Sequence, residues 1–349
     1  MRKTLTREDG IAAVYGGGVL GGGGGGHIEV GLSQITEIFT DGNCPELASP
    51  DEFSPGETTA CVALVGAPSA EDASVNKNQL LDTVRSLQSA AGIELAALMT
   101  NENGPATSIN GWLQASHLGL PVLDAPANGR AHPTGIMGSL GLHKEADYQS
   151  TQAYAGGAGE RSLSGFVHGS LNTTAQAVRQ LSVLAGGMVG VCRNPVAISR
   201  VNEHAAVGAI SHAINLGHAY MEGSTGRDKI DNVVEFLDGE IQAQDTVRSV
   251  NLRKEGGFDV GEVQIGSAEL TFWNEYMTME IEGKRLATFP DLIMTLDSNS
   301  GLPIVSAAVE EGQDLTVITV KRDRLILGSS MFDRDLLRGI ESIVKKTIA

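Results

Sequence analysis

Residues 59–65 read Thr-Ala-Cys-Val-Ala-Leu-Val, and Gly66-Ala67-Pro68 follows directly. The run is almost continuously apolar, which predicts a strand that is buried on both faces. The Gly and Pro after it predict where this strand ends. Such a strand is typical of a parallel sheet covered by helices on both sides, so this stretch points to the α/β class.

The residues that follow alternate between helical and strand-like patterns. Apolar residues have helical spacing over 78–91 and again over 105–118, whereas 94–99 and 121–123 are short apolar runs. The order is therefore strand, helix, strand, helix, strand. This order predicts a parallel sheet with right-handed crossovers.

After residue 150 the pattern becomes more varied. We expect short strands near Ala153 and Phe166, a helix over 173–184 and a longer helix over 202–221. Residues 222–226, Glu-Gly-Ser-Thr-Gly, then break the chain and predict a domain boundary.

Short, turn-bounded strand patterns dominate the rest of the chain. They cover 233–241, 246–252, 261–265, 268–273, 277–281 and 315–320, and a helix is expected over 333–347. The predicted fold is thus an N-terminal three-layer α/β domain with a mostly parallel sheet, residues 1–225. A β-rich domain with a C-terminal helix, residues 226–349, completes it.

Residues 16–26 read Gly-Gly-Gly-Val-Leu-Gly-Gly-Gly-Gly-Gly-Gly and precede His27. Thr6 and Asp9 have the spacing of a capping box for a short helix over 11–15. The glycines therefore follow a helix, whereas in Rossmann and Walker loops they follow a strand. No Gly-Lys-Ser or Gly-Lys-Thr closes the run, so a nucleotide-binding enzyme is disfavoured.

The pattern over 28–39 fits a helix, so the glycines lie just before a helix amino terminus. Backbone amides at such a terminus suit an anion, and we expect Gly24, Gly25, Gly26 and His27 to bind substrate. The same composition is compatible with a mobile loop.

Polar residues follow each of the three predicted parallel strands, in loops 66–69, 100–104 and 124–133. The carboxyl ends of parallel strands lie at one edge of a sheet, where ligands bind. We therefore expect Glu102, Asp124 and His132 to meet as catalytic residues.

Asn103 and Arg130 belong to the same loops and are expected to contact the substrate. Structural alternatives stay open: Glu102 could cap a helix, Asp124 could brace its own loop, and Arg130 could pair with Asp124. A metal site of His27, His132 and a carboxylate is also compatible with the sequence, so metal and cofactor content stay unknown.

Composition narrows the class of protein. The 349 residues carry a formal charge of −17 and have no basic stretch, which argues against nucleic acid and anionic membranes as partners. Cys44, Cys61 and Cys192 match no metal or redox spacing. With no apolar leader and no membrane-length apolar run, we expect a cytoplasmic protein. No Gly-x-Ser-x-Gly nucleophile elbow is present, so a serine hydrolase is disfavoured.

Several segments together have a recognisable order. They are residues 23–26, 65–68, 119–124, 129–133, 256–258, 272–275 and 290–297. In this order they resemble the S-methyl thiohydantoin desulfurase family, whose members often accompany hydantoinase and oxoprolinase subunits. The resemblance implies a two-domain cytosolic protein that acts on five-membered cyclic ureides, or beside enzymes that do.

The leading hypothesis is a hydrolase-like enzyme that cleaves a C–S or related bond in a hydantoin- or thiohydantoin-type ring. Glu102 or Asp124 would activate water, Arg130 and glycine amides would hold negative charge, and His132 would protonate the leaving group. The alternative is a non-catalytic binding or regulatory subunit of a hydantoinase or oxoprolinase. It is suggested by the sizeable β domain and by loops that differ from the pattern of the family that the chain resembles, such as His27 in place of an acid. A homo-oligomer is the ordinary expectation.

Overall fold

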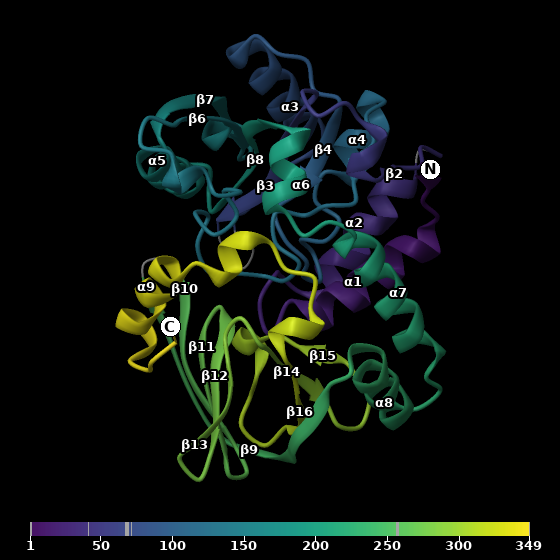
Figure 1. Ribbon diagram of the computed structural model, residues 1–349, viewed down its shortest axis with the longest axis vertical. Helices are drawn as coiled ribbons and strands as arrows, with labels where there is room; N and C mark the ends of the chain where they lie inside the picture. The colour runs from purple at the N-terminus through teal and green to yellow at the C-terminus, as the bar shows by residue number, and fades with distance from the viewer. Residues whose placement is uncertain (1, 41, 67–69, 71, 256–257, 349) are drawn as a thin grey trace.

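The computed structural model describes residues 2–40, 42–66, 70, 72–255 and 258–348. Two eight-stranded sheets, each with its own helices, lie one above the other (Figure 1). The loop residues 67–69 and the glycines 256–257, which entered the sequence analysis, lie outside the described residues. No helix in the described ranges is long and apolar enough to cross a membrane.

The first sheet is mixed. Its spatial order is β1 (Lys3–Thr4), β2 (Glu46–Ala48), β5 (Val122–Leu123), β4 (Ala97–Thr100), β3 (Thr58–Gly66), β8 (Met188–Ala197), β6 (Gln149–Gly156) and β7 (Leu163–Ser170). β2, β5, β4 and β3 are parallel, as the alternating pattern predicts. β1 and the group β8, β6 and β7 pair antiparallel, so the parallel segment is only part of the sheet.

Helices cover both faces of this sheet. They are α1 (Arg7–Leu20), α2 (Ile28–Thr40), α3 (Lys77–Ala91), α4 (Trp112–Leu118), α5 (Leu171–Leu184), α6 (Ile198–His204) and α7 (Ala209–Glu222). Successive residues of β3 face opposite sides. Val62 packs in one cluster with Val84 of α3, whereas Ala63 packs in another with Val178 of α5. The three-layer α/β architecture is therefore confirmed.

Three helices differ from the predicted ranges. α1 does not stop near residue 15 but continues to Leu20 through Gly16–Gly18. α4 begins at Trp112, because the residues 105–111 form turns. The helix expected over 202–221 is two helices, α6 and α7, because Gly208 adopts a φ of 88° between them.

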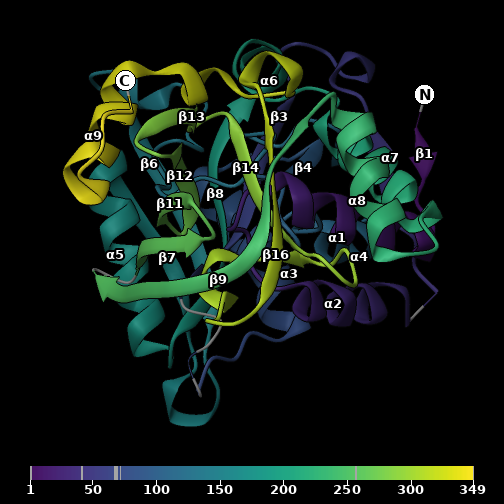
Figure 2. The same cartoon turned by 90° about the horizontal axis from the view of Figure 1, so that it is seen from below.

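The second sheet is entirely antiparallel. Its order is β13 (Lys284–Thr288), β12 (Glu275–Ile281), β11 (Ala268–Trp273), β10 (Phe258–Ile265), β9 (Glu240–Glu255), β16 (Asp314–Val320), β14 (Leu292–Asp297) and β15 (Pro303–Ile304). The long strand β9 pairs with β16 through its first half and with β10 through its second (Figure 2).

Two helices accompany the second sheet, α8 (Gly226–Leu237) and α9 (Arg334–Val344). The strand predicted over 233–241 is wrong, because residues 226–237 form α8 and β9 begins only at Glu240. The helix predicted over 333–347 is confirmed as α9, with Asp333 as its N-cap.

The two sheets share packed residues and hydrogen bonds. One core cluster combines Leu20 of α1 and Leu216 of α7 with Leu292 of β14. The carbonyl of Gly22 accepts a hydrogen bond from the backbone N–H of Tyr276 at 2.8 Å, and Gly23 accepts one from Ser306 at 3.0 Å. The domain division at residue 225 stays a prediction, and these contacts cross it.

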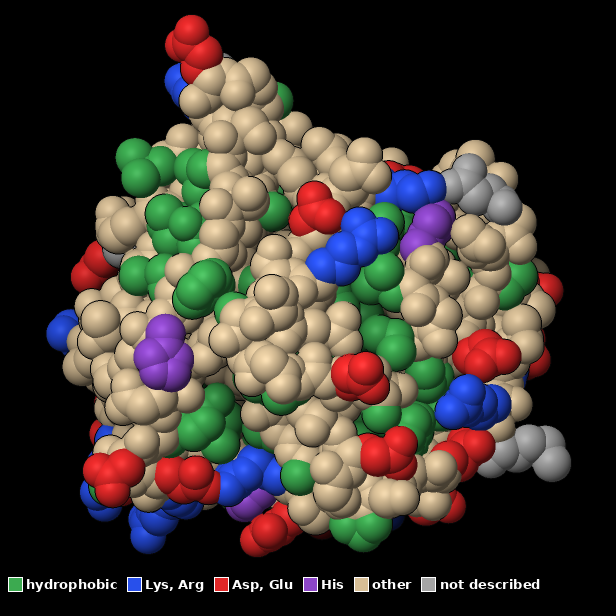
Figure 3. Space-filling model, turned by 90° about the horizontal axis from the view of Figure 1, so that it is seen from above, with side chains coloured by type: hydrophobic (Ala, Val, Ile, Leu, Met, Phe, Trp, Pro, Cys, Tyr) green, Lys and Arg blue, Asp and Glu red, His purple; other side chains and the backbone are tan. Residues whose placement is uncertain are grey.

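The surface in Figure 3 carries mixed charge. Lys and Arg side chains lie beside Asp and Glu on this face and do not gather into a basic patch. The view looks down on the first sheet from the top of Figure 1.

Candidate functional site

A cavity of about 900 Å³ lies between the two sheets. Its wall is built from the glycine loop (residues 21–26, between α1 and α2), the loops after β4 and β5, β8, α5 and the turn between β11 and β12. In Figure 1, α5 and β8 lie in the upper half of the molecule, and β11 and β12 lie in the lower half. The volume is in the upper part of the range of small-molecule sites.

Glu102 and His132 meet on this wall, although 30 residues separate them in the chain. Each is only 7% exposed, and His132 Nε2 lies 3.3 Å from Glu102 Oε2. The two atoms are not aligned for a hydrogen bond, and Nε2 has no other partner among the described residues. A small rotation of either side chain would align them.

The hydrogen bonds of His132 fix which ring nitrogen carries the proton. Its Nδ1 lies 2.9 Å from the carbonyl oxygen of Thr134, which can only accept. The neutral ring therefore holds its proton on Nδ1, and the lone pair of Nε2 faces Glu102.

The pKa values of the two groups move in opposite directions. Burial raises the pKa of Glu102 to about 8, against the lowering effects of the backbone N–H of His132 and the charge of Arg193. Burial lowers the pKa of His132 to about 4, although the Thr134 carbonyl favours the protonated ring. Between these values Glu102 holds a proton and His132 is neutral, so the pair shares one dissociable proton.

A second buried acid, Glu275, comes from the other sheet. It is the first residue of β12 and is 2% exposed, and its Oε2 has no partner among the residues described. Burial and the nearby charge of Glu102 raise the pKa of Glu275 well above its ordinary value. Sequence reasoning missed Glu275, although residues 272–275 were among those that carried the family resemblance.

Gly24, Gly25, Gly26 and His27 line the cavity where the sequence analysis expected them. A Cβ on Gly24 would lie 2.0 Å from Oε1 of Glu275, so only glycine lets the backbone approach this acid. Gly25 and Gly26 adopt φ values of 83° and 90°, which favour glycine. Their role in binding stays a prediction.

Asp124 does not reach the cavity. Its Oδ1 accepts hydrogen bonds from the backbone N–H groups of Ile210 and Ser211 at 2.9 and 3.0 Å, and its Oδ2 accepts one from the Ser211 hydroxyl. The carboxylate therefore caps the start of α7. The expected meeting of Asp124 with Glu102 and His132 is not found, because both of its carboxylate oxygens accept hydrogen bonds from the first turn of α7.

Asn103 and Arg130 are also behind the wall and do not line it. Asn103 is fully buried, and its amide donates to the carbonyls of Gly129 and Ala209. It holds two loops in place and does not contact the cavity.

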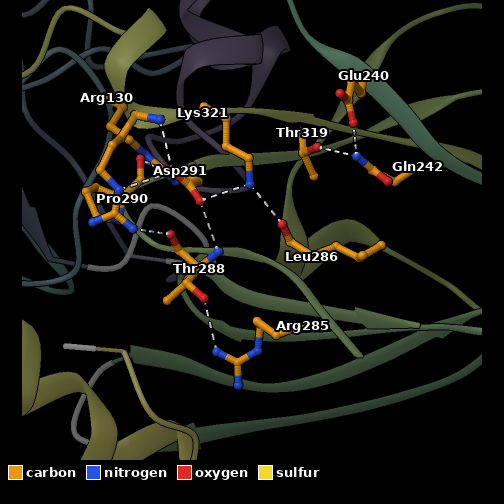
Figure 4. A network of polar contacts seen from close by, with 11 residues as sticks. Arg130, Glu240, Gln242, Arg285, Leu286, Thr288, Pro290, Asp291, Thr319 and Lys321 are labelled. Atoms are coloured by element: carbon orange, nitrogen blue, oxygen red, sulfur yellow. Dashed lines mark hydrogen bonds and ion pairs between the residues drawn. The ribbon is translucent and has the colours of Figure 1, made fainter. Parts of the chain in front are cut away.

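Arg130 joins the two sheets. It is fully buried and donates to the backbone carbonyls of Pro290 at 3.2 Å and Asp291 at 2.6 Å (Figure 4). Its guanidinium carbon lies 4.7 Å from the ring centre of Phe289. Burial lowers its pKa to about 10, although the carboxyl groups of Glu275 and Asp291 favour the charged form. Arg130 therefore does not line the cavity, and its expected contact with substrate stays a prediction.

Arg193 is a cavity residue that the sequence analysis did not single out. It lies in the middle of β8, one residue after Cys192, and is 8% exposed. A charged residue directly after an apolar run was the only available signal. Cys61 and Cys192 themselves are buried free thiols.

The metal site considered for His27, His132 and a carboxylate has no structural support. Within the described part of the chain, no group of three or more His, Cys, Asp and Glu residues is placed to hold a metal ion.

Comparison with protein families settles what the chain is related to. The family model "S-Me-THD-like, N-terminal domain" matches residues 11–161, and "S-Me-THD-like, C-terminal domain" matches residues 170–329. The chain belongs to the S-methyl thiohydantoin desulfurase family. The two matched ranges contain every residue of the cavity wall discussed above, Glu275 included.

One solved structure supports the fold. A crystal structure of a protein from Chromobacterium violaceum is 20% identical, covers 100% of this chain and 99% of its own, and has a TM-score of 0.75. At this identity the likeness concerns the fold alone. No curated protein matches the chain in sequence.

Proposed function

We propose that this protein is an enzyme that hydrolyses the C–S bond of an S-methyl thiohydantoin-type ring. The observation that carries the proposal is the buried Glu102–His132 pair, with 3.3 Å between Oε2 and Nε2, on the wall of a ligand-sized cavity. Family membership supports the substrate class. The opposite pKa shifts of the pair give an acid and a base in the same pH range.

The ring carbon that carries the S-methyl group is electron-poor and open to attack by water. In the proposed reaction the Nε2 lone pair of His132 takes a proton from water while the water oxygen bonds to this carbon. The C–S bond then breaks, and protonated Glu102 donates its proton to the leaving sulfur. Methanethiol departs as the ring nitrogen that took up the C=N electron pair during attack returns it. The proton left on the added oxygen then moves to this nitrogen, so the ring keeps the oxygen as a carbonyl.

This sequence leaves His132 protonated and Glu102 ionised. Because Nε2 and Oε2 are only 3.3 Å apart, the proton can pass directly from the imidazolium to the carboxylate. That transfer restores the starting state without a proton carrier from solvent. The overall reaction consumes one water and yields a hydantoin and methanethiol.

The remaining cavity residues would hold the ring. No described residue accepts a hydrogen bond from the backbone N–H of Gly25 or Gly26, so both groups can donate to a ligand. The carboxyl of Glu275, whose pKa burial raises, is proposed to hydrogen-bond a ring nitrogen or carbonyl oxygen. His27 borders the same space and is proposed to contact the substrate.

The test is release of methanethiol from S-methyl thiohydantoins by the purified protein. Glu102→Gln and His132→Asn are each expected to lower kcat about 10²- to 10⁴-fold, the usual contribution of a general acid or base. Asp124→Asn is the matched control, since it removes a carboxylate from the same sheet edge. It should lower stability by about 1 kcal/mol through the weakened cap and leave kcat unchanged.

An unchanged kcat in Glu102→Gln, or a large loss in Asp124→Asn, would contradict this assignment. Absence of turnover in the wild-type protein alone, with turnover after addition of a hydantoinase or oxoprolinase subunit, would favour the non-catalytic alternative. Association with such a subunit remains part of the proposal, because a hydantoinase opens the ring that this reaction would produce. Co-purification tests that association, and light scattering tests the homo-oligomer.

A further inference from the structure

Arg193 is a buried cation that has no acidic partner at ion-pair distance in the part of the chain that the structure describes. Its guanidinium lies against the loop after β5, where Nη1 is 3.5 Å from the position of a Cβ on Gly135. Among the residues described, no Asp or Glu oxygen lies within 4.0 Å of its nitrogens. Cys61 lies opposite it on β3, but burial raises the pKa of that thiol, so the sulfur stays uncharged.

The acids at the same site do not neutralise Arg193 either. The pKa of Glu102 is raised to about 8, so this group does not supply a full negative charge near neutral pH, and burial raises the pKa of Glu275 as well. An uncompensated buried guanidinium is costly, and its planar set of donors fits a carboxylate with two parallel hydrogen bonds. The missing partner is therefore best supplied by a bound anion.

Two further cations border the same cavity, in a chain with a net charge of −17. Arg179 of α5 lies with its guanidinium carbon 4.8 Å from the ring centre of Phe258. Burial and the charge of Arg193 lower the pKa of Arg179, as expected for two cations near each other. Lys254 of β9 is exposed and also lines the cavity. Asp259 and Glu37 are the remaining acids on the wall.

We infer that Arg193 binds a carboxylate carried on a side chain of the ring substrate, so that the enzyme prefers acidic thiohydantoins. The cavity of about 900 Å³ is larger than a five-membered ring needs, which leaves room for such an arm. The inference rests on the proposed function for the chemistry of the ring. The recognition of the carboxylate itself depends only on Arg193 and the cavity.

The test uses matched pairs of S-methyl thiohydantoins. One member carries a carboxylate on a one- or two-carbon arm, and the other carries the primary amide on the same arm. We expect kcat/KM to be about 10- to 100-fold higher for the acid, mostly through KM, because an ionic hydrogen bond is replaced by a neutral one. Arg193→Gln should abolish this preference. Lys254→Gln, which removes a charge at the exposed edge, should change it only a few-fold.

Two results would overturn the inference. Equal kcat/KM for acid and amide in the wild-type protein would show that no carboxylate site exists. An equal loss for both substrates in Arg193→Gln would show that Arg193 stabilises the reacting ring instead. Thermal melts with and without ligand would identify a variant that fails to fold, and Arg193→Lys would then be used, because it keeps the charge and loses the paired geometry.

A binding experiment separates this inference from the proposed reaction. The hydantoin with the carboxylate arm, which has no S-methyl group, is titrated calorimetrically into wild-type protein and Arg193→Gln. If this hydantoin binds in an Arg193-dependent way, but the protein releases no methanethiol from the S-methyl thiohydantoins, the carboxylate site is upheld and the desulfurase proposal is overturned. If the protein releases methanethiol but shows no preference for the acid and no Arg193-dependent binding, the desulfurase proposal is upheld and the carboxylate site is overturned.

Discussion

The glycine run is one stretch of sequence with two structural roles. Gly16–Gly18 lie inside α1, where a Cβ on Gly16 would be 1.9 Å from the carbonyl oxygen of Ala213 in α7. Gly21–Gly26 form the loop at the cavity, where a Cβ on Gly24 would meet the carboxyl of Glu275. The first half brings two helix backbones together, and the second half brings backbone to the buried carboxyl of Glu275.

The difference lies in what each glycine faces. The helix backbone opposite Gly16 cannot move without moving the whole of α7. The carboxyl opposite Gly24 is the end of a side chain and can rotate away. We therefore expect alanine in the first half to damage the fold and alanine in the second half to damage the site.

Gly16→Ala tests the first half and should have the largest effect. Its methyl group would overlap the backbone of α7, and such overpacking costs about 3 kcal/mol of unfolding free energy. Urea denaturation followed by circular dichroism measures the loss. An unchanged midpoint would mean that α1 and α7 do not approach as closely as described.

Gly24→Ala tests the second half. Its methyl group would displace the carboxyl of Glu275, so kcat/KM for methanethiol release should fall about 10- to 100-fold. The free energy of unfolding should change by less than about 1 kcal/mol, because the side chain can rotate. If Gly24→Ala instead keeps full activity and loses stability, the second part of the glycine run serves the fold and not the site.

The pH dependence of kcat/KM distinguishes the two parts of the glycine run further, because only the second part borders the proposed catalytic groups. The proposed reaction needs neutral His132 and protonated Glu102, whose pKa values are about 4 and about 8. Activity should rise as His132 loses its proton, stay level between these values, and fall about tenfold per pH unit once Glu102 ionises.

The pH profiles of two variants test whether Glu102 is responsible for the alkaline limb. Gly16→Ala should leave both limbs in place, whereas the residual activity of Glu102→Gln should lose the alkaline limb. Activity that rises through pH 8 would identify Glu102 as the base and not the acid. Circular dichroism at each pH verifies that the protein stays folded.

Gly339→Ala is the control for alanine in a glycine position and has the smallest expected effect. Gly339 is exposed within α9, and a Cβ there would meet nothing within 4 Å. The substitution should stabilise the protein by up to about 1 kcal/mol, because alanine favours a helix over glycine. A loss of stability in the same urea experiment would mean that helix propensity does not dominate at this position.

The sequence predicted those parts of the fold whose signals are local. The apolar run of β3 and the periodic residues of α3 are each decided within their own segment, and the parallel pairing of β3, β4 and β5 follows from their order. α8 was missed even though Ile230, Val233 and Leu237 have helical spacing and are buried. Neighbouring Val233 and Val234 gave a competing strand pattern, and only the capping box at Thr225 resolves it.

The candidate site was predictable only where sheet topology dictates it. Glu102 and His132 follow two neighbouring parallel strands, so their meeting follows from the shared edge. Asp124 follows the same edge, but its direction is set by α7, whose contact with it has no local signal. Glu275 could not be placed either, because no rule of strand order positions a turn of the antiparallel sheet beside this edge.

The hydrogen bonds from Tyr276 and Ser306 to the glycine loop have a consequence for how this protein could be made. These bonds, and those that Arg130 makes behind the cavity wall to Pro290 and Asp291, tie each half of the polypeptide to the other. If the halves were expressed as separate polypeptides, neither would contain the complete cavity until they reassembled. Gene fission between them should therefore be tolerated only where the two products find each other efficiently.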